Sequence, residues 1–298
     1  MPACTINAMS LDEIFAVHGG VATTQQLLEC LSYRTLGRRL RDHQIFQVRR
    51  GVYSQCPPQA RHQLRALDLI SGTSIVACMN TAAEIHGFCT QPDARLHILD
   101  PGIRLRTAAD LVVHQRIGAP LMKVDGRLVT APAWTAIELA RTLSRPRVMA
   151  TLDAALRSRT CTTADLDAAL REQSGRRGVV KVRELLPLAD RRAESPMESE
   201  MRLVFHDWGL PAPELQYEIV DRYGQRWRVD FAWPEFQVAA EYDSTDWHAN
   251  SEAFKHDRMK SARLQEMGWT SIPAVVDDVR RYPDELCARI FRQFDRVA

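Results

Sequence analysis

The first 53 residues change from a helical to a strand-like hydrophobic pattern, and this change restricts the possible folds more than any other feature. A first helix is predicted to end at Gly19, because apolar side chains before it recur with helical spacing: Leu11, Ile14, Phe15 and Val17. The threonines at 23–24 can cap a second helix, and Ser32 can cap a third over residues 33–43. Residues 45–53 then alternate with period two. Three short helices followed by a small ribbon predict a winged helix-turn-helix domain.

Arginines dominate the end of this segment. Positions 34–50 hold six arginines and a single acidic residue, Asp42. In helix-turn-helix proteins the last helix enters the DNA major groove, and a planar guanidinium can donate two hydrogen bonds to guanine or phosphate. We therefore predict contact with double-stranded DNA by four residues of the third helix and two at the tip of the ribbon: Tyr33, Arg34, Arg38, Arg41, Arg49 and Arg50. The alternative is a solvated or protein-binding helix face.

The composition excludes several other classes of protein. The chain has 298 residues, of which 45% are hydrophobic and 26% charged, as in soluble globular proteins of about two domains. It contains no uninterrupted apolar run of about 18 residues and no secretory signal pattern. The seven cysteines include no C-x-x-C pair, so we interpret them as reduced thiols. These features predict a cytoplasmic protein without a membrane partner or a structural zinc site.

Pattern changes predict three domains, at 1–58, 59–193 and 194–298, and an α+β fold overall. The two prolines at 57–58 mark the first linker. The mixed α/β middle segment has six helical patterns (61–71, 80–88, 133–142, 146–157, 163–173 and 179–186) and two strand patterns (96–99 and 111–115). The last segment reads as a helix, a three-strand meander, a helix, a strand and a helix, which predicts an α/β sandwich. Its net charge is −7, whereas residues 61–193 carry +7, so the last segment disfavours unassisted approach to DNA.

Two neighbouring strand patterns in the last segment bring acidic residues together. The strand over 226–233 alternates and is expected to bury one face, formed by Trp227, Val229, Phe231 and Trp233. Asp230 lies on the opposite face. If the next strand, over 237–243, pairs with it, Asp230 lies beside Glu241 and Asp243.

Clustered carboxylates repel one another unless protons or a divalent cation intervene, and hard oxygen ligands suit Mg²⁺. Asp230 and Glu241 are the predicted metal ligands of such a site. Glu198 on the preceding helix could complete the cluster, and His248 could act as a general acid or base. The alternative is that these are ordinary surface carboxylates.

At these residues the last segment resembles a known family. The motifs VDFAWP at 229–234 and VAAEYD at 238–243, followed by Trp247–His248, Asp257–Arg258 and Gly268–Trp269, resemble a domain of unknown function common in actinobacteria. That domain is similar to the very-short-patch repair endonucleases, which have a restriction-endonuclease-like fold. The resemblance covers about 194–294.

This resemblance implies that Asp230, Glu241 and Asp243 are metal-site acids and that His248 is an accessory histidine. The sequence departs from the family in two places. The Glu-x-Lys motif reads Glu241-Tyr242-Asp243 and has no lysine, and the glycine that usually follows is Ser244. Lys255 or Lys260 could substitute for the lysine only from a distance.

The front of the chain resembles a second family. HGGVATT at 18–24 and VRRGVY at 48–53 are similar to the winged-helix domain of AbiEi-type antitoxins, and TAA at 81–83, HG at 86–87 and LDAAL at 152–156 continue the likeness. As a whole the chain resembles mycobacterial antitoxins of the MenA kind. Such proteins are encoded beside a nucleotidyltransferase toxin and repress their own operon.

These observations leave three hypotheses. The first is a sequence-specific DNA-binding antitoxin and autorepressor, which requires no cofactor for DNA binding and has a cognate nucleotidyltransferase toxin as a partner. The second is a Mg²⁺-dependent DNA endonuclease that the winged helix targets to its site. The third is a protein-interaction module in which the acidic last domain covers a basic partner. The oligomeric state stays open in all three.

Overall fold

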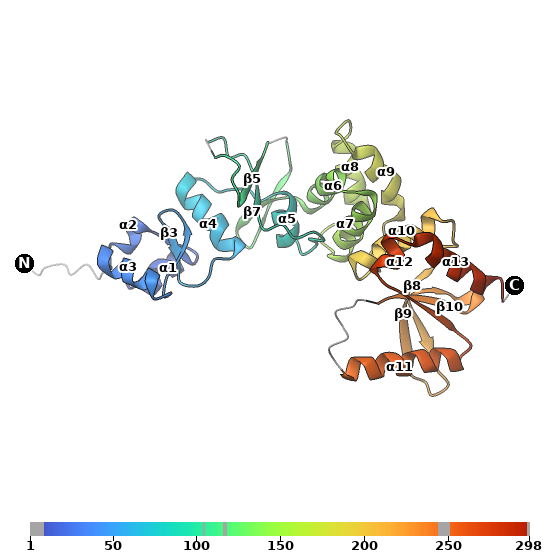
Figure 1. The fold of residues 1–298 in the computed structure, drawn as a ribbon. Coiled ribbons are helices and arrows are strands. Elements are labelled where there is room, and N and C mark those ends of the chain that lie inside the picture. Colours follow the sequence, from blue (N-terminus) through green and yellow to red (C-terminus); the bar gives the residue numbers. More distant parts are fainter. Residues whose placement is uncertain (1–8, 104, 116–117, 244–250, 297–298) are drawn as a thin grey trace, which may run out of the picture. The chain divides into compact units, whose positions relative to one another are not determined.

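The structure is a computed structural model that describes residues 9–103, 105–115, 118–243 and 251–296, with the backbone alone for 251–254. Contacts divide the chain into two compact units (Figure 1). Unit 1 comprises Met1–Ile85 and Gln91–Ala131, and unit 2 comprises His86–Thr90 and Pro132–Ala298. Both contain helices and strands, which confirms the mixed α and β class. The predicted division into three domains stays a prediction.

Unit 1 begins with three helices and a three-stranded antiparallel sheet. The elements in chain order are α1 (Leu11–Val17), β1 (Val21–Thr23), α2 (Thr24–Leu27), α3 (Tyr33–Arg41), β2 (Phe46–Arg49) and β3 (Val52–Ser54), and the sheet has the order β1-β3-β2. The predicted caps are confirmed, because the hydroxyls of Thr23 and Ser32 accept backbone N–H groups at the starts of α2 and α3. The sequence pattern missed β1, which exists only by pairing with β3.

The rest of unit 1 is a small α/β assembly. It contains α4 (Ala60–Ser71), α5 (Met79–Ile85), the parallel pair β4 (Leu96–Leu99) and β5 (Leu111–His114), and the antiparallel pair β6 (Leu121–Val124) and β7 (Arg127–Thr130). Ala77 bridges to Ile98 and to Val129, so it joins both strand pairs around one apolar core. The predicted helices and strands are confirmed to within a few residues. The β6–β7 hairpin was not predicted.

Unit 2 starts with a group of packed helices, α6 (Pro132–Thr142), α7 (Arg145–Arg157), α8 (Thr163–Glu172) and α9 (Val179–Leu185), followed by a single 3₁₀ turn at Leu186–Leu188. All four helices were predicted. α7 is almost wholly buried from Val148 to Leu156, because it packs between α6 and the helix that opens the next segment.

The remainder of unit 2 is a four-stranded sheet with helices on both faces (Figure 1). The chain order is α10 (Pro196–Asp207), β8 (Glu214–Val220), β9 (Arg226–Trp233), β10 (Val238–Tyr242), α11 (Ser251–Glu266), β11 (Thr270–Ala274), α12 (Val276–Arg280) and α13 (Pro283–Phe294). The sheet order is β11-β10-β9-β8, with β10 and β11 parallel and the other pairs antiparallel. One apolar core lies under α10, α12 and α13, and the other under α11. The predicted order is confirmed, and α12 is an addition.

The prediction that β9 buries a single face, formed by its four large apolar side chains, was wrong. Phe231 and Trp233 belong to the core under α10 and α13, whereas Trp227 and Val229 belong to the core under α11. The partner strand β8 reverses its faces at the same level. The reversal coincides with Gln216, which has the left-handed backbone angle φ = +52° and lies opposite Asp230 in the register. Both strands therefore contribute large side chains to both cores.

No helix among the described residues is both long and apolar enough to cross a membrane. Disulfide bonds are absent among the six cysteines in that part of the chain.

Candidate nucleic-acid and carboxylate sites

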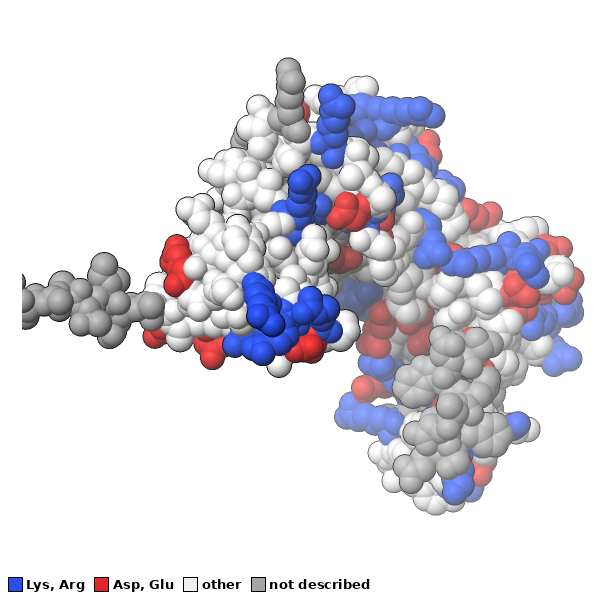
Figure 2. Space-filling model, turned by 60° about the vertical axis from the view of Figure 1, so that its left-hand side comes forward, with Lys and Arg blue, Asp and Glu red and all other residues white. Residues whose placement is uncertain are grey.

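Helix α3 presents one buried and one exposed side. Leu36 is buried in the core of unit 1, whereas Tyr33 is 73% exposed and Arg34, Arg38 and Arg41 are exposed. Figure 2 shows a group of Lys and Arg side chains gathered on one part of the surface. The structure thus brings these four predicted residues to one accessible helix surface.

The two arginines predicted at the ribbon tip have different surroundings. Arg50 is exposed in the turn between β2 and β3, which Gly51 closes with φ = +74°. The Arg49 side chain is only 16% exposed, and its Nη2 lies 2.8 Å from the Asp110 carboxylate within the same unit. The charge of Arg49 is therefore already paired, whereas that of Arg50 faces solvent.

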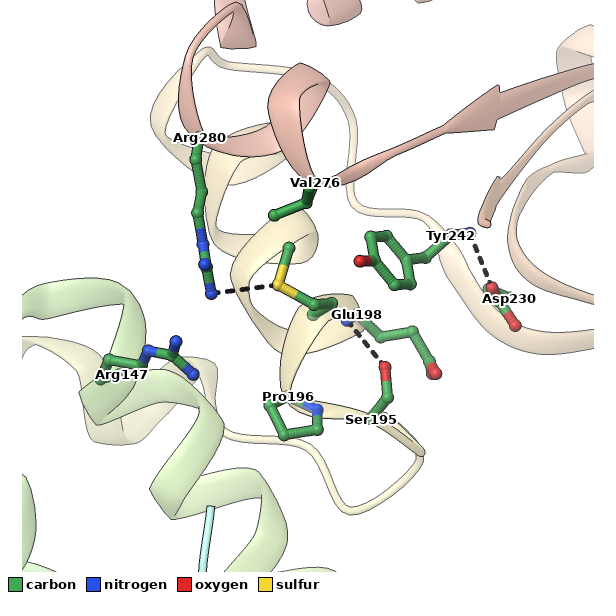
Figure 3. A pocket seen from close by; sticks show the side chains of 9 residues that line it. Arg147, Ser195, Pro196, Glu198, Asp230, Tyr242, Val276 and Arg280 are labelled. Carbon is green, nitrogen blue, oxygen red and sulfur yellow. Dashed lines mark hydrogen bonds between the residues drawn. The ribbon is translucent and has the colours of Figure 1, made fainter. Parts of the chain in front are cut away.

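Asp230 is held at the junction of three strands. β9 and β10 pair as expected, with Phe231 opposite Ala240, so Asp230 and Glu241 lie on adjacent strands. The Tyr242 backbone N–H donates to Asp230 Oδ2 at 2.9 Å (Figure 3), and the Gln216 side-chain amide donates to Oδ1 at 3.5 Å. Burial raises the pKa of Asp230 above its usual value, although these hydrogen bonds oppose the shift.

Glu198 joins this carboxylate through Gln216. It lies in the first turn of α10, and its Oε2 accepts the Glu194 N–H at 2.8 Å and the Gln216 amide at 3.0 Å. Burial raises the pKa of Glu198, and the neighbouring charge of Asp230 raises it further. The side-chain amide of Gln216 therefore bridges Glu198 and Asp230, whose negative charges repel each other. Gln216 is also the residue of β8 with the left-handed backbone angle.

Glu241 has a different set of partners. Lys260 on α11 donates from Nζ to Glu241 Oε2, and the Ser271 hydroxyl donates to Oε1 at 3.3 Å. Burial raises the pKa of Glu241, whereas the positive charge of Lys260 lowers it. Lys260 thus places a positive charge beside Glu241, although the motif Glu241-Tyr242-Asp243 contains no lysine.

The acids line two separate pockets. Glu198 and Asp230 line a pocket of about 570 Å³, and Glu241 and Asp243 line another of about 780 Å³. Tyr242 borders both. Asp243 is exposed, and His248 lies outside the described residues. The structure therefore brings Asp230 together with Glu198, and Glu241 together with Lys260.

We tested whether these donors form a metal site. Within the described ranges, no group of three or more His, Cys, Asp or Glu side chains is placed to hold a metal ion. The Glu241 oxygens are occupied by Lys260 and Ser271, which leaves Asp230 and Glu198 as the carboxylates facing one pocket. Mg²⁺ at Asp230 and Glu198 would need further oxygen ligands, such as water or a phosphate, and we derive no step through a metal.

Sequence reasoning missed several residues of this region. Gln216 gave no signal, because a lone polar residue in a strand is ordinary. Arg147 and Arg280 line the same pocket as Asp230 but lie more than one hundred residues apart. Arg228 forms a two-pronged ion pair with Glu194, at 2.9 and 2.8 Å. Only the fold shows these pairings.

Comparison with known proteins identifies the relatives of the chain. Two proteins from different strains of Mycobacterium tuberculosis, Uncharacterized protein MT2308 and Uncharacterized protein Rv2248, are each 54% identical over 253 residues, which cover 85% of this chain and 93% of theirs. The chain belongs to their family. In addition, residues 75–188 match the AbiEi antitoxin C-terminal domain.

The AbiEi antitoxin domain starts just before α5 and ends at the 3₁₀ turn after α9. It supports the predicted antitoxin of a toxin–antitoxin system, and an AbiEi antitoxin in general has a toxin as its partner. The arginines of α3 and the carboxylates of β9 and β10 lie outside the matched region.

Proposed function

We propose that the protein is an antitoxin that binds the DNA of its own operon through residues 1–58 and represses it. The observation that carries this proposal is the exposed surface of α3, where Arg34, Arg38 and Arg41 lie opposite the buried Leu36. Tyr33 is exposed at the start of the same helix. The order of helices and strands and the sheet order β1-β3-β2 support the proposed winged helix, in which α3 would be the recognition helix.

The arginines have two roles in this proposal. Those on α3 contact base edges and phosphates in the major groove, and Arg50 contacts the backbone from the turn between β2 and β3. Arg49 supports that turn through Asp110 instead of contacting DNA. The proposed protein partner is a cognate toxin of the nucleotidyltransferase class, and the resemblance to antitoxins of the MenA kind supports this class.

A gel-retardation experiment tests DNA binding. Labelled DNA from upstream of the gene is titrated with wild type, with the double variant Arg38→Gln/Arg41→Gln, and with Arg106→Gln, which changes an exposed arginine elsewhere in unit 1. Loss of one guanine contact costs about 1–3 kcal/mol, so we expect the double variant to bind at least tenfold more weakly and the control to bind normally. Equal binding by all three proteins would refute the proposal.

A second candidate is a Mg²⁺-dependent DNA endonuclease, and one observation favours it. Asp230 and Glu241 lie on adjacent strands, and Lys260 brings an ammonium group to Glu241 from α11. The order α10, β8, β9, β10, α11, β11 also resembles the core of restriction-endonuclease-like domains.

The same gel tests cleavage when it is run with Mg²⁺ in one set of lanes and EDTA in the other. Endonuclease activity predicts shortened fragments confined to the Mg²⁺ lanes, lost in Asp230→Asn and kept in Glu235→Gln, which changes an exposed acid in the 3₁₀ turn Pro234–Phe236 after β9. Intact DNA under a range of divalent metals would refute this candidate and leave the repressor proposal standing.

A further inference from the structure

The pocket that Asp230 lines has a basic end formed by two arginines from different helices (Figure 3). Arg147 comes from α7 and Arg280 from α12, and both contact Glu200 on α10. The Glu200 side chain is only 3% exposed. Arg280 donates to its two oxygens from Nε and Nη2 at 2.8 and 3.0 Å, whereas Arg147 Nε lies 3.3 Å from one of them.

These contacts leave an excess of positive charge. The two-pronged bond from Arg280 already neutralises the buried carboxylate and satisfies both of its oxygens. Arg147 adds a second positive charge, and Glu200 is the one acid within ion-pair distance of either guanidinium in the described part of the chain. The two side chains are 30% and 41% exposed and line the pocket. Arg280 Nη2 also donates to Met197 Sδ at 3.2 Å, so the Nη1 group of Arg280 and the Nη groups of Arg147 are left for a ligand.

We propose that this pocket binds a phosphate group through Arg147 and Arg280. Guanidinium forks match phosphate oxygens, which accept several charge-assisted hydrogen bonds at once. The first turn of α10 also borders the pocket at Pro196 and Met197, and the positive end of its helix dipole adds to the attraction. The volume of about 570 Å³ is within the range of small-ligand sites and accommodates a nucleotide.

The opposite end of the pocket decides the orientation of the ligand. Glu198 and Asp230 repel a second phosphate group there, so the phosphate occupies the arginine end and the uncharged part of the ligand extends towards the acids. If the second candidate function holds, the group bound at the arginine end is a phosphate of the DNA strand; that extension rests on the proposed endonuclease. Phosphate binding itself does not depend on cleavage.

Calorimetric titration of the full-length protein in EDTA tests the proposal. The probes are inorganic phosphate, thymidine 5′-monophosphate, unphosphorylated thymidine, and a short thymidylate strand with and without a 5′-phosphate. We expect saturable binding of inorganic phosphate, of thymidine 5′-monophosphate and of the 5′-phosphorylated strand, no binding of thymidine, and weaker binding as salt is added. Preference for the free nucleotide or for the phosphorylated strand end identifies the source of the group. Absence of saturable binding by every phosphate probe would overturn the proposal.

Variants separate binding from folding. Arg147→Gln leaves the two-pronged Arg280–Glu200 bond in place, so we expect a folded protein whose affinity for phosphate falls about tenfold or more. Arg147→Lys keeps the charge without the fork and is expected to be intermediate. Arg281→Gln is the matched control, since Arg281 follows Arg280 directly and its side chain is 70% exposed. Unchanged affinity in Arg147→Gln would refute the site, whereas retardation of operator DNA by α3 would be unaffected by that result.

Discussion

Lys260 on α11 forms an ion pair with Glu241 on β10, nineteen residues away in the chain. The local motif Glu241-Tyr242-Asp243 has no lysine, so the positive charge beside this glutamate comes from the helix that covers the sheet. The structure therefore places a lysine beside Glu241, although the local sequence motif contains none.

The first prediction concerns this pair. Since the ammonium group lowers the pKa of Glu241 against the effect of burial, Lys260→Met is expected to raise that pKa further. Carboxyl-carbon NMR titration of Glu241 measures the change. Lys255→Met, an exposed lysine on the same helix, is the control and should leave the titration unchanged. An identical Glu241 titration in Lys260→Met and wild type would show that the ion pair does not form in solution.

The second prediction concerns stability and pH. Burial raises the folded-state pKa of Asp230, so the folded protein binds this proton more tightly than the unfolded chain does. This difference lowers the free energy of unfolding. The loss is absent below the pKa of Asp230 in the unfolded chain, and it grows as the pH rises towards and through the pKa of Asp230 in the folded protein. Asp230→Asn removes this loss and is expected to stabilise the protein at pH 7.5, with little difference from wild type near pH 3. Urea unfolding at both pH values measures this; equal or lower stability of Asp230→Asn at pH 7.5 contradicts it.

The third prediction separates the two arginines at the β2–β3 turn. Each phosphate contact contributes about one to the slope of log affinity against log salt. Arg50→Gln should therefore reduce the slope for operator DNA by about one. Arg49→Gln should reduce it less, because Arg49 is already paired with Asp110. Retardation assays over a salt series measure both slopes, and a larger effect of Arg49→Gln would assign the contact to Arg49.

The fourth prediction concerns Gly178, the residue before α9. Its backbone has φ = +85°, and an added Cβ would overlap the backbone carbonyl of Arg141. Gly178→Ala should destabilise the protein by about 2–5 kcal/mol, from backbone strain plus the overlap. Gly175→Ala, with φ = +79° and open space around the new Cβ, should cost about 1–2 kcal/mol. Chemical denaturation compares the two, and equal costs would show that the overlap relaxes freely.

Sequence patterns predicted most elements because those elements follow from local chemistry. The caps Thr23 and Ser32, and the helical spacing of apolar residues, act over a few positions and need no distant partner. The strand β1 and the hairpin β6–β7 were missed because their short segments become strands only through pairing.

The candidate sites divide in the same way. The arginine surface of α3 was readable because one helix period places Arg34, Arg38 and Arg41 opposite Leu36. The sequence also predicted that Asp230 and Glu241 lie on adjacent, paired strands, as they do. The separation of the acids into two pockets was not predictable, since it depends on which helix covers each sheet face.

The sequence by itself determined the order of the elements, the amphipathic helices and the arginine-rich side of α3, because these depend on residue spacing along the chain. The tertiary structure decided the partners: Asp110 for Arg49, Lys260 for Glu241, and Glu200 for Arg147 and Arg280. Charged side chains are paired by proximity in space. Arg280 and Glu200 are 80 residues apart in the chain and meet only because the helices that carry them pack together. That packing converts scattered charges into the acidic and basic ends of one pocket.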